Sequence, residues 1–324
     1  MTQPLIIAVP SKGRLEENVN RLFAEADMPL RRDGARGYQG YIREIPNIEI
    51  SYLSASEIAT RLKEGAVHFG VTGEDLLREE IPDLESSVML LAPLGFGHAD
   101  VVVAIPDLWI DVTHMSDLAE VAGDFRQRHG QRLRVATKYI HLTQDFFARH
   151  GITDYTIVRS FGATEGAPSS GAAEAIVDIT STGATLVANQ LRVPDDGTIL
   201  KSEANLAASL TASWSAEAQA AARAVLHRLS ARMRAQTMTE MEFNAPNGIT
   251  LDWRQLMQDF TIELVAEPNA NMTSQKLLVN NKDVTRLAAR LHQMGVAQIA
   301  SRKGDFFFTA RNEIFDRLAS RLPS

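Results

Sequence analysis

Residues 5–15 read Leu-Ile-Ile-Ala-Val-Pro-Ser-Lys-Gly-Arg-Leu, an aliphatic run that ends in a polar loop with two cations. A continuous aliphatic run of this kind is typical of a strand buried on both faces of a parallel sheet. Apolar residues then recur at helical spacing over residues 15–26. The pattern therefore predicts a strand, a loop and a helix, the opening unit of an α/β fold with a largely parallel sheet.

The same rhythm continues through the first two thirds of the chain. We expect helices at residues 57–63 and 142–150, and strands at residues 48–53, 67–72, 88–92, 101–105, 134–137, 156–158, 175–179 and 198–202. The last of these strands would carry the chain back toward the first unit. This order predicts two α/β lobes joined by crossing strands, similar to the periplasmic binding proteins. Ligands of such folds bind between the lobes, at the carboxyl ends of strands.

A small α+β module is expected at the C-terminus. A long helix with an apolar face from Trp214 to Met233 leads to a turn-rich break at residues 244–248. Beyond it we expect helices at 284–294 and 314–322, strands at 261–266, 276–279, 296–300 and 305–309, and no strand after the final helix. The expected domains are lobe I at 1–104 plus 196–240, lobe II at 105–195, and the module at 245–324.

The composition narrows the classes of function. The chain has 324 residues, and its 40 Asp and Glu against 33 Lys and Arg give a formal net charge of −7. This balance argues against broad binding to nucleic acid or to an anionic membrane, but allows a local basic pocket. The chain has no cysteine, which excludes thiolate metal sites and cysteine nucleophiles and fits a reducing cytoplasm. The apolar stretch at 88–106 is interrupted by proline, glycine and charge, so we expect no membrane span.

The strongest local signal is Glu-Ala-Ile-Val-Asp-Ile-Thr-Ser-Thr-Gly-Ala-Thr at residues 174–185. A buried strand ends near Asp178, and a hydroxyl-rich loop then leads into a helix. Hydroxyls and free N–H groups at a helix start suit a phosphate, and Gly183 permits a positive φ and close approach of a ligand. Asp178 would bind sugar hydroxyls beside that phosphate. The alternative is a turn whose Ser and Thr side chains simply cap the helix.

This loop resembles the phosphoribosyl-pyrophosphate (PRPP) loop of the ATP phosphoribosyltransferase family. Four further segments resemble family elements in the same order: the Lys-Gly-Arg loop at 10–15, the Gly-x-x-Gly-x-Asp-x-Leu element at 69–77, the Arg-Ile-Ala-Thr-x-Tyr strand at 134–139, and Glu-x-Ala-Pro at 165–168. The sequence departs from the family pattern at Ser54, Glu57 and Ala59, and at Asp100, where the family has an arginine. Five segments in register over residues 5–191 identify the chain as a member of this family.

The resemblance implies that N1 of ATP displaces pyrophosphate from PRPP, the first step of histidine biosynthesis. The nucleophile belongs to the substrate, so no catalytic triad is needed, and fixed cations would stabilise the departing pyrophosphate. The expected catalytic residues are Lys12, Arg14 and Arg36, whereas Arg31 and Arg32 are interpreted as ordinary surface charges. The expected PRPP-binding residues are Asp178, Thr180, Ser181, Thr182, Gly183, Ala184 and Thr185, and those on the nucleotide side are Gly73, Glu74, Asp75 and Glu165.

The resemblance also implies cofactors and partners. Mg²⁺ would enter chelated by PRPP rather than through a preformed protein cage. Separately, the eight histidines form no His-x-His or His-x-x-x-His pair, so we expect no zinc site. Long-form members end in a ferredoxin-like domain that binds histidine and inhibits the enzyme, and residues 245–324 stand in its place. Short-form members use a separate regulatory subunit, and the family forms homo-oligomers, dimers or hexamers. The alternative from another class is a non-catalytic cytoplasmic two-lobed protein that binds a small anionic metabolite.

Overall fold

The computed structural model describes residues 3–34, 37–244, 251–265 and 274–322. The chain forms two compact units, one of Met1–Arg21, Leu30–Ala221 and Leu318–Ser324, and one of Leu22–Pro29 and Ala222–Arg317. Within the described residues the strands form three sheets, two in the first unit and one in the second. None of the helices in these residues combines the length and apolarity needed to cross a membrane.

The first sheet has the order β2-β3-β4-β1-β5-β13-β6. Its strands are β1 (Leu5–Pro10), β2 (Leu30–Arg32), β3 (Gln39–Ile42), β4 (Ile48–Leu53), β5 (Phe69–Gly73), β6 (Val88–Pro93) and β13 (Ala204–Ser209). Helices α1 (Gly13–Glu25), α2 (Ala55–Lys63), α3 (Glu74–Glu80) and α4 (Leu84–Ser87) connect them. β1 is parallel to both β4 and β5, and Ile7 pairs with Ile50 and Phe69. Ile7 is fully buried, which confirms the interpretation of the opening run.

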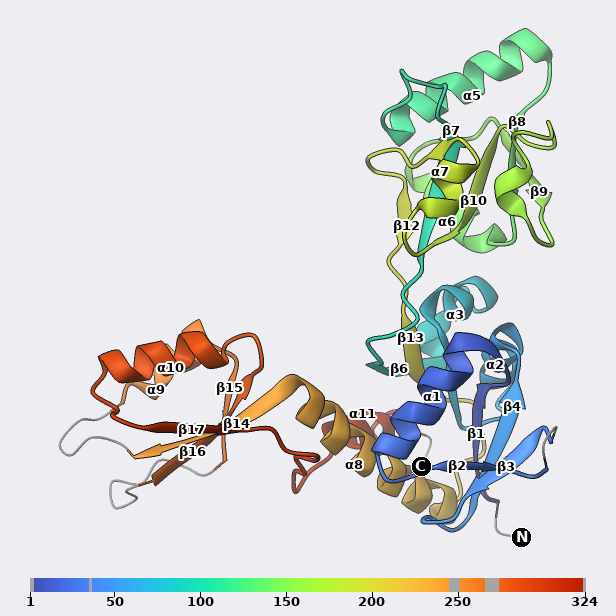
Figure 1. Ribbon diagram of the computed structural model, residues 1–324. Coiled ribbons are helices and arrows are strands. Elements are labelled where there is room, and N and C mark those ends of the chain that lie inside the picture. The colour runs from blue at the N-terminus through green and yellow to red at the C-terminus, as the bar shows by residue number, and fades with distance from the viewer. Residues whose placement is uncertain (1–2, 35–36, 245–250, 266–273, 323–324) are drawn as a thin grey trace. The chain divides into compact units, whose positions relative to one another are not determined.

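The second sheet has the order β11-β7-β10-β8-β9, and β12 also pairs with β7. Its strands are β7 (Asp100–Pro106), β8 (Leu133–Thr137), β9 (Tyr155–Arg159), β10 (Ala175–Thr180), β11 (Leu191–Arg192) and β12 (Thr198–Leu200). The helical segments are α5 (Met115–His129), α6 (Ile140–Arg149), a 3₁₀ turn (Thr164–Gly166) and α7 (Ala184–Ala188). Residues 94–99 and 201–203 cross between the two sheets (Figure 1). The predicted two-lobed α/β core is confirmed.

The third sheet confirms a small C-terminal α+β module, and its first strand lies before residue 245. Its order is β15-β16-β14-β17 with antiparallel neighbours. The elements follow one another as β14 (Met238–Asn244), α9 (Trp253–Asp259), β15 (Ile262–Leu264), β16 (Ser274–Asn280), α10 (Val284–Gln293) and β17 (Ile299–Arg302). This is the ferredoxin-like βαββαβ order, and β17 is the closing strand. Its first strand directly follows α8 (Ala216–Thr237) and precedes the expected break, of which residues 245–248 lie outside the described residues.

The strand predicted at residues 305–309 is wrong. The N–H of Phe307 donates to the carbonyl of Ala231 on α8 at 3.0 Å instead of joining a sheet. The rings of Phe306 and Phe308 stack with centroids 5.5 Å apart. Alternating apolar residues here pack locally, and the last helix of the described residues is α11 (Glu313–Ala319).

His68 links the stability of the first lobe to pH. Its Nδ1 accepts the N–H of Ile6 at 3.0 Å and its Nε2 donates to the carbonyl of Ser213 at 3.1 Å, so the ring is neutral. Burial lowers the pKa of His68. In the unfolded chain the histidine binds a proton at its ordinary pKa of about 6.5, more readily than in the folded protein. The neutral His68 ring therefore contributes its full share to the stability of the folded state above that pH, and this share is lost as the pH falls toward the folded pKa.

We expect the Tm to fall on acidification from about pH 7.5 to about pH 5.5, and to fall less in His68→Gln, whose amide can accept and donate but does not titrate. Thermal unfolding followed by circular dichroism measures both changes. The exposed His129, replaced by glutamine, is the control and should behave as the wild type. An equal fall in wild type and His68→Gln would contradict the role given to His68.

Candidate active site

The site is built at the carboxyl ends of parallel strands. β1, β4 and β5 are mutually parallel in the first sheet, as are β8, β9 and β10 in the second. A pocket of about 540 Å³ lies between the two lobes at these ends. Its first-lobe lining is Ala55, Ser56, Leu76, Glu79 and Glu80, and its second-lobe lining is Lys138, Tyr139, residues 159–164 and Asp178. An inter-lobe crevice of this kind is the expected ligand site of such a fold.

The loop after β10 has the geometry of an anion cradle. Gly183 has a φ of +75°, and no atom lies within 4 Å of the place where its Cβ would stand. Thr180 Oγ1 accepts the N–H of Gly183 at 2.9 Å, which fixes the turn. The first helical bond runs from the N–H of Val187 to the carbonyl of Gly183. The backbone N–H groups of Thr185 and the residue after it therefore precede the helical ladder, where an anion would bind.

The rest of the predicted PRPP-binding set divides into two groups. The first group is open to a ligand. Thr182, Ala184 and Thr185 are exposed on the loop, and Asp178 lines the pocket. Oδ1 of Asp178 accepts the N–H of Ile179 at 2.8 Å. Ser181 differs, because its hydroxyl donates to the carbonyl of His98 at 2.9 Å. This hydrogen bond ties the loop to residues 94–99, so the hydroxyl proton of Ser181 is already used within the protein.

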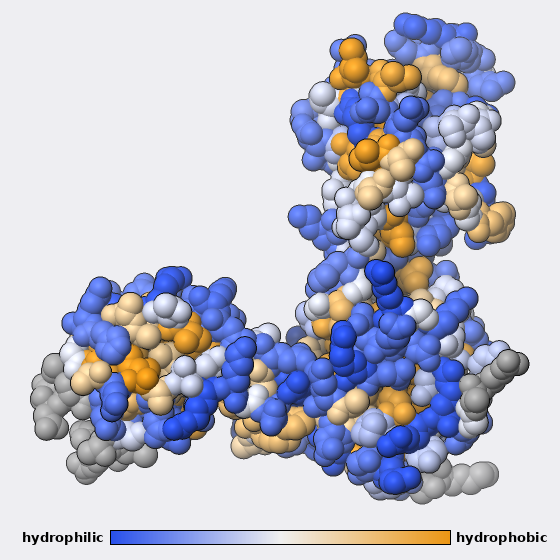
Figure 2. Space-filling model, viewed as in Figure 1, coloured by the Kyte–Doolittle hydropathy of each residue, from blue (hydrophilic) through white to orange (hydrophobic). Residues whose placement is uncertain are grey.

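The contact between Ser181 and His98 places the loop after β10 on the same side of the molecule as the predicted cations Lys12 and Arg14. A Cβ on Gly97, the neighbour of His98, would stand 3.4 Å from Cδ1 of Leu15 in the first turn of α1. Lys12 and Arg14 flank Gly13 just before this point, are exposed, and make no ion pair with a described residue. The surface over α1 is largely hydrophilic (Figure 2). Arg36, the third predicted cation, lies outside the described residues.

The predicted nucleotide-side residues are less available to a ligand. Asp75 is 6% exposed; its Oδ2 accepts the Tyr139 hydroxyl at 2.7 Å, and its Oδ1 accepts the Ser202 hydroxyl at 2.9 Å. Burial first, then the negative charge of Asp75, raises the pKa of Tyr139, so its hydroxyl stays a donor. Gly73 makes room for this carboxylate, because a Cβ there would lie 2.2 Å from Asp75 Oδ1. Asp75 therefore joins the lobes through Tyr139, and Gly73 leaves the space that its carboxylate occupies.

The other two members of that set, Glu74 and Glu165, take no part in the bonds of Asp75. Glu74 forms an ion pair with Arg78 at 2.7 Å. Glu165 is half-buried in the 3₁₀ turn, and its carboxylate has no hydrogen bond or ion pair with another described residue. Of the predicted nucleotide-side carboxylates, Glu165 is thus the one free to meet a ligand.

Glu79, which the sequence analysis missed, completes the junction between the lobes. Its carboxylate accepts the N–H groups of His141 and Leu142, both at 3.0 Å, and so caps α6 of the other lobe. Glu79 is 8% exposed and lies one helical turn beyond Asp75 on α3. The available signal was the start of α6 itself, where the N-cap Tyr139 supplies no capping side chain and leaves N–H groups for an outside acceptor.

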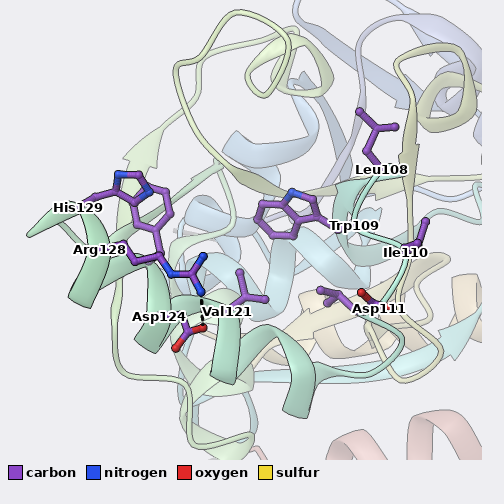
Figure 3. A pocket seen from close by; sticks show the side chains of 10 residues that line it. Leu108, Trp109, Ile110, Asp111, Val121, Asp124, Arg128 and His129 are labelled. Carbon is purple, nitrogen blue, oxygen red and sulfur yellow. Dashed lines mark hydrogen bonds and ion pairs between the residues drawn. The ribbon is translucent and has the colours of Figure 1, made fainter.

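A second hollow, of about 340 Å³, lies beside α5 in the second lobe (Figure 3). Trp109 and Val121 form its floor, and its arginine, Arg128, is already paired with Asp124 at 3.4 Å. The hollow is therefore poorly suited to a polyanionic substrate. Among the described residues, no three His, Asp or Glu side chains are grouped so that they would hold a metal ion.

Two joined α/β lobes with a pocket between them, at the carboxyl ends of their parallel strands, define a class of proteins that bind small molecules between lobes. The profile of the ATP phosphoribosyltransferase family (HisG) matches residues 54–234. The chain belongs to this family. An ATP phosphoribosyltransferase of Nitrobacter winogradskyi is 50% identical over 324 residues, 98% of each chain. Another, of Rhodopseudomonas palustris, is 58% identical over 242 residues, 74% of each chain.

Among solved structures, the ATP phosphoribosyl transferase (HisG:HisZ) complex from Thermotoga maritima aligns with 63% of this chain and 87% of its own, at 25% identity and a TM-score of 0.47. The family match and the whole-chain relatives confirm the identification made from the five sequence segments. They also favour an enzyme of histidine biosynthesis, a pentosyltransferase, over a non-catalytic binding protein.

Proposed function

We propose that the crevice transfers the phosphoribosyl group of PRPP to N1 of ATP, with the loop at residues 180–185 holding the 5-phosphate. The observation that carries this proposal is the open left-handed turn at Gly183, which Thr180 fixes and which leads into the first turn of α7, where backbone N–H groups precede the bond from Val187 to Gly183. The carboxylate of Asp178 accepts hydrogen bonds from the ribose hydroxyls beside that phosphate. The sugar is thereby held with its anomeric carbon toward the crevice.

Lys12 and Arg14 stabilise the leaving group in this mechanism. The N1 lone pair forms a bond to the anomeric carbon as the bond from that carbon to the pyrophosphate oxygen breaks, with inversion. The electron pair of the broken bond leaves with pyrophosphate, whose negative charge grows in the transition state. Cations placed there bind the transition state more tightly than the substrate, which accelerates the step.

Magnesium belongs to the substrate in this proposal. PRPP and pyrophosphate bind Mg²⁺ through their own oxygens, whereas the described residues offer no group of carboxylates and imidazoles for a resident ion. We therefore assign no step to a protein-bound metal.

The proposal is tested by incubating the full chain with ATP, PRPP, Mg²⁺ and pyrophosphatase and measuring phosphoribosyl-ATP. Asp178→Asn should raise the KM for PRPP by about 10- to 100-fold, because hydrogen bonds to a charged acceptor are lost, and leave the KM for ATP nearly unchanged. The exposed Asp145 on α6, replaced by asparagine, is the control. Absence of product, with the chain alone or with a regulatory subunit, would contradict the proposed reaction. An equal rise in the KM for ATP and for PRPP in Asp178→Asn would contradict the ribose-binding role of Asp178.

We also propose the organisation around this core. The first lobe comprises residues 1–104 and residue 196 to the end of α8, and the second lobe comprises residues 105–195. The module begins at β14 instead of at residue 245, because β14 pairs with both β16 and β17. The enzyme acts in the cytoplasm as a homo-oligomer.

The C-terminal module is proposed to bind histidine and inhibit the enzyme. What supports this is its ferredoxin-like order, which is that of the regulatory domain of long-form members. Titration of the full chain with histidine should give saturable binding and loss of activity, with the same concentration of arginine as control. If histidine does not bind, a separate regulatory subunit takes this role.

A further inference from the structure

A large aromatic ring is held in the open on the second-lobe wall of the crevice. Phe161 follows β9, lines the 540 Å³ pocket and is 93% exposed. Its loop is constrained, because Ser160 Oγ and Thr164 Oγ1 are 2.8 Å apart in a hydrogen bond and Ala163 has a φ of +49°, rare for a residue with a side chain. Such strain persists where the surrounding structure enforces it, and clusters at ligand sites.

Two cations stand beside this ring. Lys138 follows β8 and Arg159 ends β9, and these strands are parallel neighbours in which Thr137 pairs with Arg159. Both side chains are exposed, line the same pocket, and make no ion pair within the part of the chain that the structure describes. The opposite wall carries Glu79, whose carboxylate is taken up by two N–H groups, and Glu80. The second-lobe wall thus carries two cations and one carboxylate, that of Asp178, whereas the first-lobe wall carries two carboxylates, so the second-lobe wall is the more positive side of the crevice.

From these positions we infer that Phe161 stacks on the purine of ATP while Lys138 and Arg159 hold its triphosphate. This inference rests on the proposed function and moves the nucleotide subsite from residues 73–75, where Asp75 is occupied, to the wall formed by residues 138 and 159–161. Asp178 lines the same pocket, so a purine on Phe161 would lie beside the ribose that it attacks. An aromatic face supplies stacking to any base, and the two cations supply the preference for a triphosphate.

The test separates these two contributions. Phe161→Ala should weaken ATP and AMP alike, raising the KM for ATP roughly 10-fold, while Phe161→Tyr keeps wild-type values. Lys138→Gln should weaken ATP roughly 10-fold and AMP much less, because AMP lacks the outer phosphates. The KM for PRPP should change by less than about 2-fold in each variant. Equilibrium dialysis with ATP and AMP in the absence of PRPP gives the affinities independently of turnover.

Two variants are matched controls. Leu108→Ala removes another highly exposed apolar side chain, which lies outside the crevice, and Arg43→Gln removes a cation from the turn before β4, at the opposite edge of the first sheet. Unchanged ATP affinity in Phe161→Ala, or a parallel rise in the KM for PRPP, would overturn the stacking role. Equal losses of ATP and AMP in Lys138→Gln would overturn the triphosphate role. A wild type that binds ATP but makes no product would refute the proposed function and leave the dialysis test of the wall intact.

Discussion

Replacing Arg14 with alanine is expected to lower kcat by about 100-fold, with a much smaller rise in the KM for ATP. Arg14 is an exposed cation in the first turn of α1, without an ion-pair partner among the described residues, beside the left-handed Gly13. Its charge would meet the pyrophosphate most strongly when the bond to the sugar is breaking. Removing one such preorganised donor typically reduces the rate by two to three orders of magnitude.

Steady-state kinetics with both substrates varied would measure this effect. Arg14→Lys keeps the charge but not the planar fork, so it should recover part of the rate. Arg43→Gln, at the far edge of the same sheet, should leave kcat unchanged. A raised KM at constant kcat would instead make Arg14 a residue that binds substrate and transition state equally.

Gly73→Ala is expected to lower the free energy of unfolding by about 2 kcal/mol, although residue 73 touches no substrate in our proposal. The new Cβ would stand 2.2 Å from Asp75 Oδ1, so the carboxylate must move away from its donors. The buried hydroxyls of Tyr139 and Ser202 would then lose their shared acceptor. Asp75→Asn should have a comparable effect, because an amide cannot accept at both ends.

A double-mutant cycle in urea checks the connection. The two substitutions break the same contacts, so the double variant should lose clearly less stability than the sum of the single losses. Gly123→Ala is the control: it lies inside α5 with no atom within 4 Å of its Cβ position, and alanine favours a helix there. Additive losses would mean that Gly73 acts separately from Asp75.

The sequence predicted the features that depend on local pattern. The run at residues 5–9, the hydroxyl-rich loop after β10 and the two-lobed order all follow from hydrophobic spacing and turn chemistry. β14 was missed because it follows α8 without a turn between Thr237 and Met238, so the helical pattern concealed its start. The break at 244–248 then appeared to be the boundary.

The uses of individual polar side chains could not be predicted in the same way. Ser181 and Asp75 belong to segments with family motifs, a loop and the first turn of α3, yet their partners His98, Tyr139 and Ser202 are 64 to 127 positions away. No periodicity reports such pairings, which arise only when the lobes meet. Phe161 could not be predicted for a different reason. Its proposed role in stacking depends on its exposure to solvent, and a sequence does not show which phenylalanines stay exposed.

The hydrogen bonds from α3 to the start of α6 oppose separation of the two lobes. Asp75 and Glu79 lie one turn apart on a single rigid helix, and together they hold the Tyr139 hydroxyl and two backbone N–H groups of the other lobe. A swing about residues 94–99 and 201–203 that parts these helices breaks all three bonds in one motion. Because the three bonds share one helix, we expect them to break together if the lobes separate, rather than one after another.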